Sequence, residues 1–310
     1  MKKPIFVIYA PSYDEDSGGC IALHKLCHIL NSIDYSAFLF PDIRSNTQFS
    51  TLGREMSYSS FDDLVSRNFK SNSTFQCPIL SAESLTEIKF SNNVVTVYPE
   101  VTDGNPLDAK NVVRWLLHDL GFHTGRININ RGDFIVPYDL DIKKLLIPGC
   151  QVSSSFLRVL HIPFDKYNIV GESSKRSGTA YCMRKGKGKK IVHAEKNGIL
   201  IDGKSHNEIS EIFKRVERFY SYDTKTTYSR LAVLCGCESI VVPDDGVTLT
   251  EWCSDPKFRI GIHYGEVGCK PSPEIINQLK VVLQNDEQYN IERARLVVSE
   301  ILDYFKLTDC

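Results

Sequence analysis

The chain has 310 residues, a length that predicts two domains of about 150 residues each. Hydrophobic residues make up 42% of the chain and charged residues 24%, values that allow ordinary globular cores. The formal net charge is −1, so bulk electrostatics favour neither nucleic acid nor an anionic membrane as a partner. Any anion site must therefore be local.

Signals for export and for metal binding are missing from the sequence. The apolar run at residues 5–10 is too short for a signal peptide or a membrane span, so we expect a cytoplasmic protein. It would contact the inner face of the membrane peripherally if its acceptor is lipid-linked. The ten cysteines show no C-x-x-C spacing, the nearest pair being Cys235 and Cys237. We expect buried free thiols, no metal site and no cofactor.

The first half alternates strand-like and helix-like segments. Apolar runs predict strands at Ile5–Ala10, Ser36–Pro41, Val94–Tyr98, Phe134–Pro137 and Leu145–Ile147. Helical spacing of apolar residues predicts helices at Cys20–Leu30 and Asp108–Leu117. Residues 148–178 are rich in Pro, Gly and Ser, which predicts a crossover between domains, with a short helix at Ser154–Leu160.

The second half repeats this alternation. The predicted strands are Thr179–Met183, Gly198–Ile201, Tyr220–Tyr222, Ser239–Val242 and Arg259–His263. The predicted helices are Glu208–Phe219 with Asn207 as its cap, Thr226–Leu234, Thr248–Cys253 and Pro273–Leu307.

This pattern predicts two doubly wound, Rossmann-like α/β domains that face each other across a cleft. We expect an N-terminal acceptor domain at 1–150 and a C-terminal donor-binding domain at 151–285. A C-terminal helix at 286–310 is expected to pack back on the N-terminal domain. In such sheets ligands bind outside the carboxyl ends of the strands, so the cleft is the expected site.

The first candidate site feature is Gly18-Gly19, which opens a helix directly after the first predicted strand. A helix N-terminus offers unpaired N–H groups, and glycine lets a phosphate or sugar approach the backbone. The alternative is a simple turn. The same loop carries Asp14, Glu15 and Asp16, any of which could be a general base or only part of a solvated acidic surface.

The second candidate is the basic stretch 166–196, which holds nine Lys and Arg residues against two Glu residues. Its core, residues 184–190, interleaves these charges with glycine after a predicted strand. Such a loop suits a diphosphate, and Arg184 and Lys187 are the residues that we expect to hold it. RNA, an anionic membrane or plain solvation of the loop are the alternatives.

The third candidate is the segment 219–243, which reads as strand, polar loop, helix and buried strand. Thr226 and Thr227 stand where the helix is expected to begin, so their hydroxyl and N–H groups could bind phosphate and sugar oxygens. In the alternative interpretation Asp223 only caps this helix.

The segment 219–243 also resembles the donor-binding region of GT-B glycosyltransferases. The family pattern has an acidic residue, a second one eight positions on, and then a Cys-Gly before a strand. Asp223 and Cys235-Gly236 match this pattern, but Leu231 stands at the second acidic position and cannot bind ribose hydroxyls. Glu238 or another group would have to substitute, or the donor lacks a nucleotide. The segments 98–100, 111–115 and 246–252 look like parts of bacterial polysaccharide and O-antigen glycosyltransferases.

The resemblance implies a metal-independent transfer of a sugar from an activated, phosphate-bearing donor, with a nucleotide sugar expected, to a glycan or lipid-linked saccharide. Nucleic acid is not an expected partner. Tyr222, Asp223, Thr226 and Thr227 would bind the donor together with Gly18 and Gly19. Asp16 or Glu100 would be the base of an inverting reaction and would bind the acceptor in a retaining one. The reserve candidates are Asp14, His118 and His123.

Two other classes of function remain open from the sequence. One is a phosphoribosyl-type transferase or a phosphosugar or nucleotide-sugar epimerase on a similar scaffold. The other is a non-catalytic module that binds anions or RNA. Identifying the product that the purified protein forms separates an epimerase from a glycosyltransferase, because an epimerase needs no acceptor.

Overall fold

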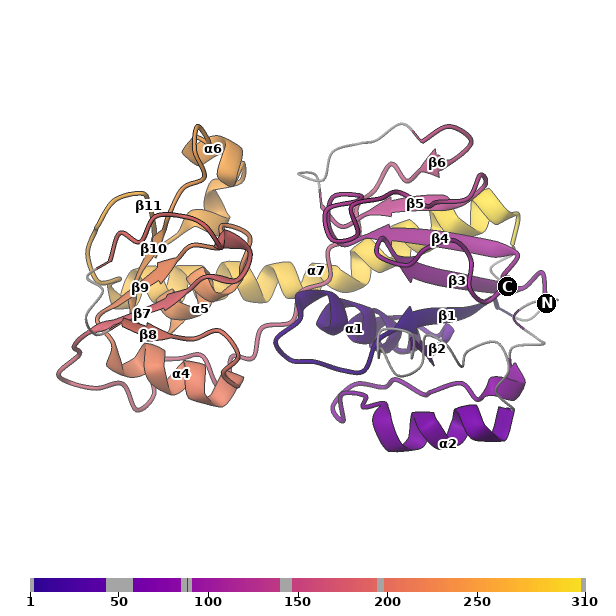
Figure 1. Ribbon diagram of the computed structural model, residues 1–310, viewed down its shortest axis with the longest axis horizontal. Coiled ribbons are helices and arrows are strands. Elements are labelled where there is room, and N and C mark those ends of the chain that lie inside the picture. Colours follow the sequence, from indigo (N-terminus) through magenta and orange to yellow (C-terminus); the bar gives the residue numbers. More distant parts are fainter. Residues whose placement is uncertain are drawn as a thin grey trace. The chain divides into compact units, whose positions relative to one another are not determined.

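The computed structural model describes residues 3–42, 58–84, 88, 91–139, 147–193 and 198–307. The chain divides into two compact units (Figure 1). The first unit comprises Met1–His161 and Gln288–Cys310, and the second comprises Ile162–Glu287. Each unit has its own parallel sheet with helices packed against it, which confirms the predicted class of two α/β domains.

The sheet of the first unit has six parallel strands in the order β2-β1-β3-β4-β5-β6. Their bounds are β1 Ile5–Ala10, β2 Ser36–Pro41, β3 Val94–Pro99, β4 Asn111–Leu116, β5 Phe134–Pro137 and β6 Gln151–Val152. The strand order reverses direction between β1 and β3. This topological switch point is where ligands of doubly wound sheets bind.

Helices cover both faces of this sheet. Against one face pack α1 (Gly18–Ser32) and the end of the long helix α7 (Pro273–Phe305), in a core that includes Leu26, Val97 and Ile301. On the opposite face, α2 (Tyr58–Asn68) brings Phe61 against a second core. A short 3₁₀ turn, η1 (Ala82–Ser84), follows α2.

The helix predicted at Asp108–Leu117 is wrong, because these residues contain strand β4. Val112 to Leu116 are buried without exception, so the strand lacks the polar alternation that would have identified it. Its charged residue, Arg114, is fully buried and donates to the Thr102 and Gly104 carbonyls and to Asp133 Oδ2 at 3.0 Å. A strand at the centre of a sheet that is covered on both faces has a continuous apolar sequence, as a buried helix has.

The second unit has five parallel strands in the order β11-β10-β9-β7-β8. Their bounds are β7 Thr179–Cys182, β8 Gly198–Leu200, β9 Arg218–Ser221, β10 Glu238–Val241 and β11 Ile262–Tyr264. The strand order reverses between β7 and β9, so the switch point of this unit lies between those two strands.

The helical elements of the second unit are short apart from α7. They are η2 Arg184–Gly186, α4 His206–Arg215, α5 Tyr228–Leu234, α6 Leu249–Trp252 and η4 Pro256–Arg259. One core joins α4, α5 and the first part of α7 to the sheet through Phe213, Leu231 and Leu279. A smaller core on the opposite face contains Tyr220 and Ile240.

Several predicted boundaries are wrong in this half. Helix α4 begins at His206 because Ser205, not Asn207, caps it, in a reciprocal box with Glu208. It ends at Arg215, and Phe219 belongs to β9.

Three further segments differ from the prediction or lie outside the description. The segment 154–160 forms no helix, and β11 starts three residues after the predicted Arg259. Of the strand predicted at Leu145–Ile147, the first two residues lie outside the described residues, and Ile147 belongs to no strand. No helix in the described ranges is long and apolar enough to cross a membrane.

Candidate functional site

Two loops meet at the switch point of the second unit. One leaves β7 and contains residues 183–190, and the other leaves β9 and contains residues 222–227. Gly186 lies so close to the Tyr222 carbonyl that a Cβ at this position would collide with it. The two segments that the sequence predicts to bind the donor are therefore packed directly against each other.

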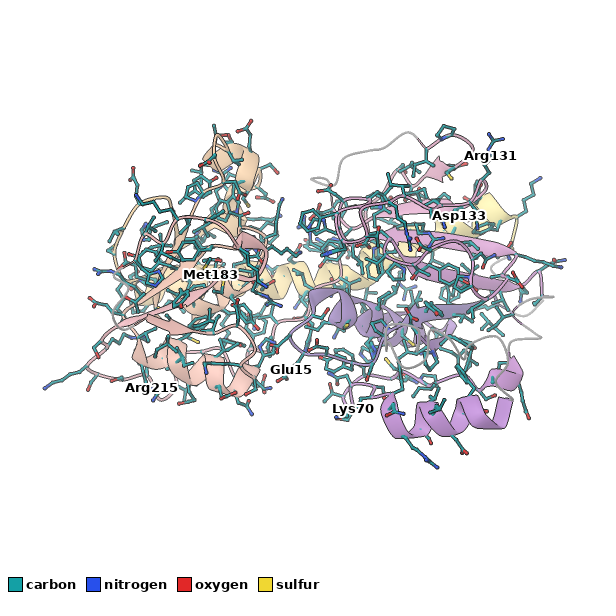
Figure 2. All side chains as sticks on the ribbon, in the orientation of Figure 1. Glu15, Lys70, Arg131, Asp133, Met183 and Arg215 are labelled. Carbon is teal, nitrogen blue, oxygen red and sulfur yellow. The ribbon has the colours of Figure 1, made fainter. Side chains whose placement is uncertain are left out.

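The β7 loop is held in a strained conformation. Arg184 has φ +37°, a left-handed value that costs a non-glycine residue about 1–3 kcal/mol. Asp202, just after β8, accepts hydrogen bonds from the backbone N–H of Met183 and of Arg184, the latter at 2.8 Å. The guanidinium of Arg184 lies 5.2 Å from the centre of the Tyr228 ring. Backbone and side chain of Arg184 are thus both fixed. Figure 2 labels Met183 at the start of this loop.

The remaining charges of the β7 loop differ in how firmly they are held. Lys187 is exposed to solvent. Lys189 donates to the Val242 carbonyl at 2.8 Å and pairs with Asp244 at 2.7 Å. Burial raises the pKa of Asp244, but hydrogen bonds from Lys189 and Thr224 outweigh this effect and lower it. Lys189 therefore ties the β7 loop to the carboxyl end of β10, and Lys187 is available to a ligand.

The β9 loop contains two buried residues that shape it. Tyr222 is fully buried, and its hydroxyl contacts Val192 N at 2.9 Å and His193 Nδ1 at 2.8 Å. Asp223 is 4% exposed, and its Oδ1 accepts from Lys225 N at 3.0 Å. Both side chains form hydrogen bonds with other residues of the chain, so they stabilise the conformation of the loop.

Two threonines end the β9 loop. Helix α5 begins at Tyr228, two residues later than predicted, so Thr226 and Thr227 precede the helix. Thr227 is exposed and Thr226 half-buried, and Thr226 Oγ1 accepts a long hydrogen bond of 3.3 Å from Tyr228 N. Their hydroxyls, like the exposed Lys225, are polar groups of this loop that a ligand can reach.

The structure explains why a leucine stands at position 231. Leu231 is 2% exposed and lies on the core side of α5, where a carboxylate would be buried. Glu238 does not substitute for it at the switch point. Glu238 opens β10, at the amino-terminal edge of the sheet, where it accepts from Arg218 Nε at 2.8 Å and from Gly268 N at 2.7 Å.

The switch point of the first unit contains the glycine pair. Gly18 and Gly19 open α1, whose N-cap Ser17 accepts from Cys20 N. No atom lies within 4 Å of where a Cβ of Gly18 would stand, and a Cβ of Gly19 would lie 3.6 Å from the Leu117 side chain. The backbone at Gly18 is therefore open to a ligand.

Two candidate bases belong to this same edge. Asp16 follows β1, and its N–H donates to Asp14 Oδ1 at 2.9 Å. Glu100 follows β3, the neighbouring strand, and its Oε2 accepts from Leu117 N at 3.0 Å. Leu117 thus connects the glycine pair to Glu100, because its side chain faces Gly19 while its N–H holds the Glu100 carboxylate.

The two switch points carry opposite charge. The loops of the first unit carry the carboxylates of Asp14, Glu15, Asp16, Glu100, Asp103 and Asp119. Arg126, on the loop after β4, forms an ion pair with Asp103. Residues 184–190 of the second unit hold five Lys and Arg residues and no acidic residue. A phosphate is therefore attracted to the second unit and repelled by the first.

Sequence reasoning missed the residues that hold the loops in place. Asp202, His193, and the pair of Lys189 with Asp244 all act through contacts distant in sequence. The position of Asp202 directly after a predicted strand was a usable signal, because such positions reach the carboxyl edge of a sheet. Lys196 of the predicted basic stretch lies outside the described residues.

The expectation of buried thiols holds for five of the described cysteines, whereas Cys269 is exposed. The nine cysteines within the described ranges are all free. Burial raises the pKa of Cys182 to about 11 and that of Cys235 to about 12, so both are neutral near pH 7. Across the described part of the chain, no three His, Cys, Asp or Glu side chains gather as a metal-binding group.

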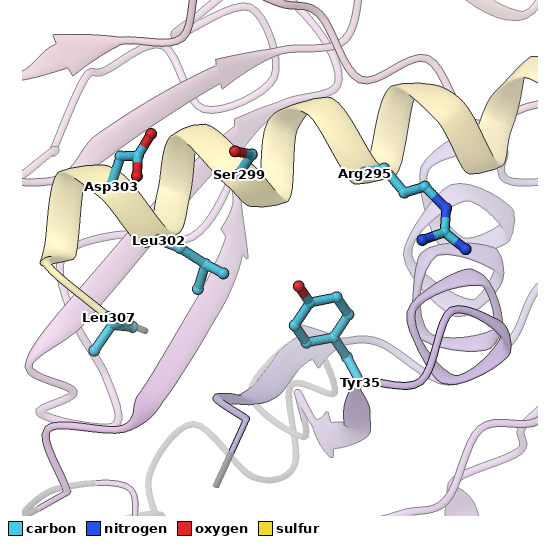
Figure 3. A pocket seen from close by; sticks show the side chains of 6 residues that line it. All are labelled: Tyr35, Arg295, Ser299, Leu302, Asp303 and Leu307. Atoms are coloured by element: carbon cyan, nitrogen blue, oxygen red, sulfur yellow. The ribbon is translucent and has the colours of Figure 1, made fainter. Parts of the chain in front are cut away.

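A separate cavity of about 200 Å³ lies in the first unit, away from its switch point (Figure 3). Tyr35, Arg295, Ser299, Leu302, Asp303 and Leu307 line it. Tyr35 directly precedes β2, so this cavity is at the amino-terminal edge of the first sheet. It is thus at the edge opposite to Gly18 and Glu100.

No protein-family model matches this chain, and no curated protein matches it. Among solved structures it is similar to Arabidopsis thaliana UGT89C1 complexed with quercetin, at 10% identity and a TM-score of 0.36, over 97% of this chain and 94% of that one. It is also similar to the Streptomyces sp. SF2575 glycosyltransferase SsfS6, at 9% identity and a TM-score of 0.34, over 97% and 96% of the two chains. A third is the glycosyltransferase VinC in complex with DTDP, at 8% identity and a TM-score of 0.37, over 97% and 95%. At these sequence identities and TM-scores, the chemistry of the chain is inferred from its own residues.

Proposed function

We propose that this protein is a glycosyltransferase that transfers a sugar from a phosphate-bearing donor, expected to be a nucleotide sugar, to a saccharide or lipid-linked saccharide. One observation carries the proposal. A strained cationic loop, residues 183–190, is packed against a hydroxyl-bearing loop, residues 222–227, at the switch point of a parallel sheet. Strain that the surroundings enforce at a ligand-binding edge is typical of functional sites.

The leaving diphosphate is the group that these loops fit. Arg184 and Lys187 neutralise the negative charge that develops as the sugar–phosphate bond breaks. Because Asp202 fixes the Arg184 backbone, little reorganisation is needed during the reaction. The hydroxyl groups of Thr226 and Thr227 donate hydrogen bonds to phosphate or sugar oxygens. Tyr222 and Asp223 maintain the conformation of the loop.

The core position of Leu231 bears on the donor. The carboxylate that the family pattern uses for ribose is missing there, so the nucleoside is held by other groups or is absent. A sugar linked to a lipid diphosphate or to a simple phosphate offers the same charged group as a nucleotide sugar, and both belong in the test.

We assign the acceptor to the acidic edge of the first unit. In an inverting reaction Asp16 or Glu100 takes the proton from the attacking hydroxyl, and in a retaining reaction these carboxylates bind acceptor hydroxyls. We propose a cytoplasmic location, at the inner face of the membrane if the acceptor is lipid-linked.

The test is a thermal-shift panel of nucleotide sugars, free nucleotides and sugar phosphates, followed by product analysis. A ligand at 100 times its Kd should stabilise the wild-type protein by about 2.7 kcal/mol. The double substitution R184A/K187A should remove that shift. K175A is the matched control, because Lys175 is an exposed lysine that precedes β7 at the opposite edge of the sheet.

Other outcomes distinguish the competing functions. Turnover of a nucleotide sugar without any acceptor would indicate an epimerase. RNA affinity that falls steeply with salt, without donor turnover, would indicate a binding module and contradict the proposal. A shift that survives R184A/K187A would place the phosphate elsewhere.

A further inference from the structure

An exposed aromatic cluster lies on the loop that leaves β4, residues 117–130. The rings of Phe122 and His118 stack with their centres 4.1 Å apart and their planes at 27°. The His123 ring packs against both, at 5.1 Å from His118 and 5.0 Å from Phe122. Phe122 is nevertheless 55% exposed. A large hydrophobic side chain held at the surface needs an explanation when it adjoins a candidate site.

The loop is built to hold Phe122 outward. Gly125 N donates to Gly121 O at 2.7 Å, and Gly104 N donates to Asn128 O at 3.1 Å. Leu120 and Ile129 of the same loop point into a core cluster under it. The loop therefore has its own apolar anchors, and Phe122 is not required for them.

The aromatic cluster is continuous with the proposed acceptor edge. His118 directly follows Leu117, whose N–H binds the Glu100 carboxylate at 3.0 Å. Val101, next to Glu100, is another exposed apolar residue of this edge, at 42%. Leu117 thus connects the aromatic cluster to the candidate base Glu100.

The charges of this edge select the kind of ligand. Its carboxylates repel phosphates, nucleotides and anionic lipid headgroups, and Arg126 on the loop after β4 is paired with Asp103. A neutral ligand with one apolar face and a rim of hydroxyls fits an aromatic ring beside hydrogen-bond-accepting carboxylates. A pyranose ring has this form: its C–H face covers an aromatic ring, and its hydroxyls reach imidazole and carboxylate groups.

We propose that Phe122, backed by His118 and flanked by His123, is a stacking platform for a neutral sugar ring of the acceptor. This assignment rests on the proposed function and adds a subsite and a ligand class to it. It makes the terminal sugar of the acceptor, rather than a lipid, the group that is recognised at this edge.

The experiment is saturation-transfer NMR with methyl glycosides of glucose, galactose, mannose and N-acetylglucosamine, on the wild type and on F122A, F122Y and I127A. At least one glycoside should receive saturation on its C–H protons from the wild type. F122A should weaken its binding about fivefold to tenfold, and F122Y should retain it. I127A is the control, since Ile127 is 56% exposed on the same loop.

Nucleotide binding to R184A/K187A is measured in parallel, so that the two proposals can fail separately. If no glycoside binds, or if F122A binds it as the wild type does, the platform is refuted while the donor site stands. If a nucleotide, and no neutral glycoside, loses affinity in F122A, the ligand class is wrong. If neither nucleotides, nucleotide sugars nor sugar phosphates bind to the wild type, the proposed function itself fails.

Discussion

At the scale of single residues, the proposed donor site depends on the conformation of Arg184. Arg184 is a non-glycine residue at φ +37°, a conformation that its surroundings must maintain. Here Asp202 and the contact of Gly186 with Tyr222 maintain that conformation. Glycine would be easier to accommodate at this position, so our proposal requires the guanidinium itself to bind the donor.

This argument predicts that R184G separates stability from function. Glycine adopts positive φ without strain, so the melting temperature should stay the same or rise slightly. Donor affinity, measured by calorimetry, should fall at least about tenfold because a charge-assisted contact is lost. As a control, K185G places glycine one residue away without a positive φ to relieve, and it should cost about 0.5–1 kcal/mol. A melting temperature that drops several degrees in R184G would mean that Arg184 is structural.

Among the residues of the candidate site, what could be predicted from the sequence is the set of side chains that face solvent. Arg184, Lys187 and Thr227 follow predicted strands, and position after a strand is a local property. Tyr222 and Asp202 show the limit of this reasoning. Whether a tyrosine hydroxyl reaches a ligand or His193 depends on a segment some 30 residues away, which no local pattern encodes.

At the scale of elements, the sequence predicts that strands and helices alternate. It does not distinguish a strand from a helix where the element is completely buried. The sequence of strand β4 predicts a helix because both faces of the strand are buried and no polar alternation marks it. Helix α4 was given the wrong cap because Ser205 and Asn207 are both good capping residues. The structure decides for Ser205, whose side chain and backbone exchange hydrogen bonds with Glu208.

The end of α7 supplies a prediction on pH. Glu300 accepts hydrogen bonds from the Ser154 and Ser155 N–H groups at 2.8 and 3.1 Å, and from the Ser153 and Ser154 hydroxyls. Burial raises the pKa of Glu300, but these bonds outweigh it and lower the pKa below its usual 4.5. A lowered folded-state pKa stabilises the fold fully above the unfolded-state pKa, and this contribution is lost as the pH falls through the folded-state value.

The E300Q variant should therefore be less stable than the wild type at pH 7. The difference in free energy of unfolding should shrink between about pH 5 and pH 3, as the wild-type carboxylate takes up its proton. Urea unfolding at several pH values measures this difference. E292Q, at an exposed glutamate of the same helix, is the control and should show only a small difference at pH 7. A gap that stays constant for E300Q would mean that the interaction with the 153–155 segment does not depend on charge.

At the scale of the whole molecule, two units with similar sheets have switch points of opposite sign. Both sheets reverse strand order between their first and third strands, so topology alone would allow either to hold a phosphate. Charge separates them, because residues 184–190 carry five positive charges and no carboxylate, while the loops after β1 and β3 are acidic. The near-neutral net charge of the chain conceals this division, which becomes visible only when each unit is considered alone.

This division predicts where ligands protect the chain from hydrogen exchange. The nucleotide that stabilises the protein best should slow exchange at residues 183–193 and 222–228, since ligand-bound loops open less often. It should leave residues 11–19 and 117–128 unchanged. A neutral glycoside should do the reverse, protecting 117–128 and not 183–193. Because the readout is local, it does not depend on turnover or on a correct guess of the natural acceptor. Protection of the acidic loops by the nucleotide would contradict the assignment of the phosphate to the second unit, whatever reaction the protein catalyses.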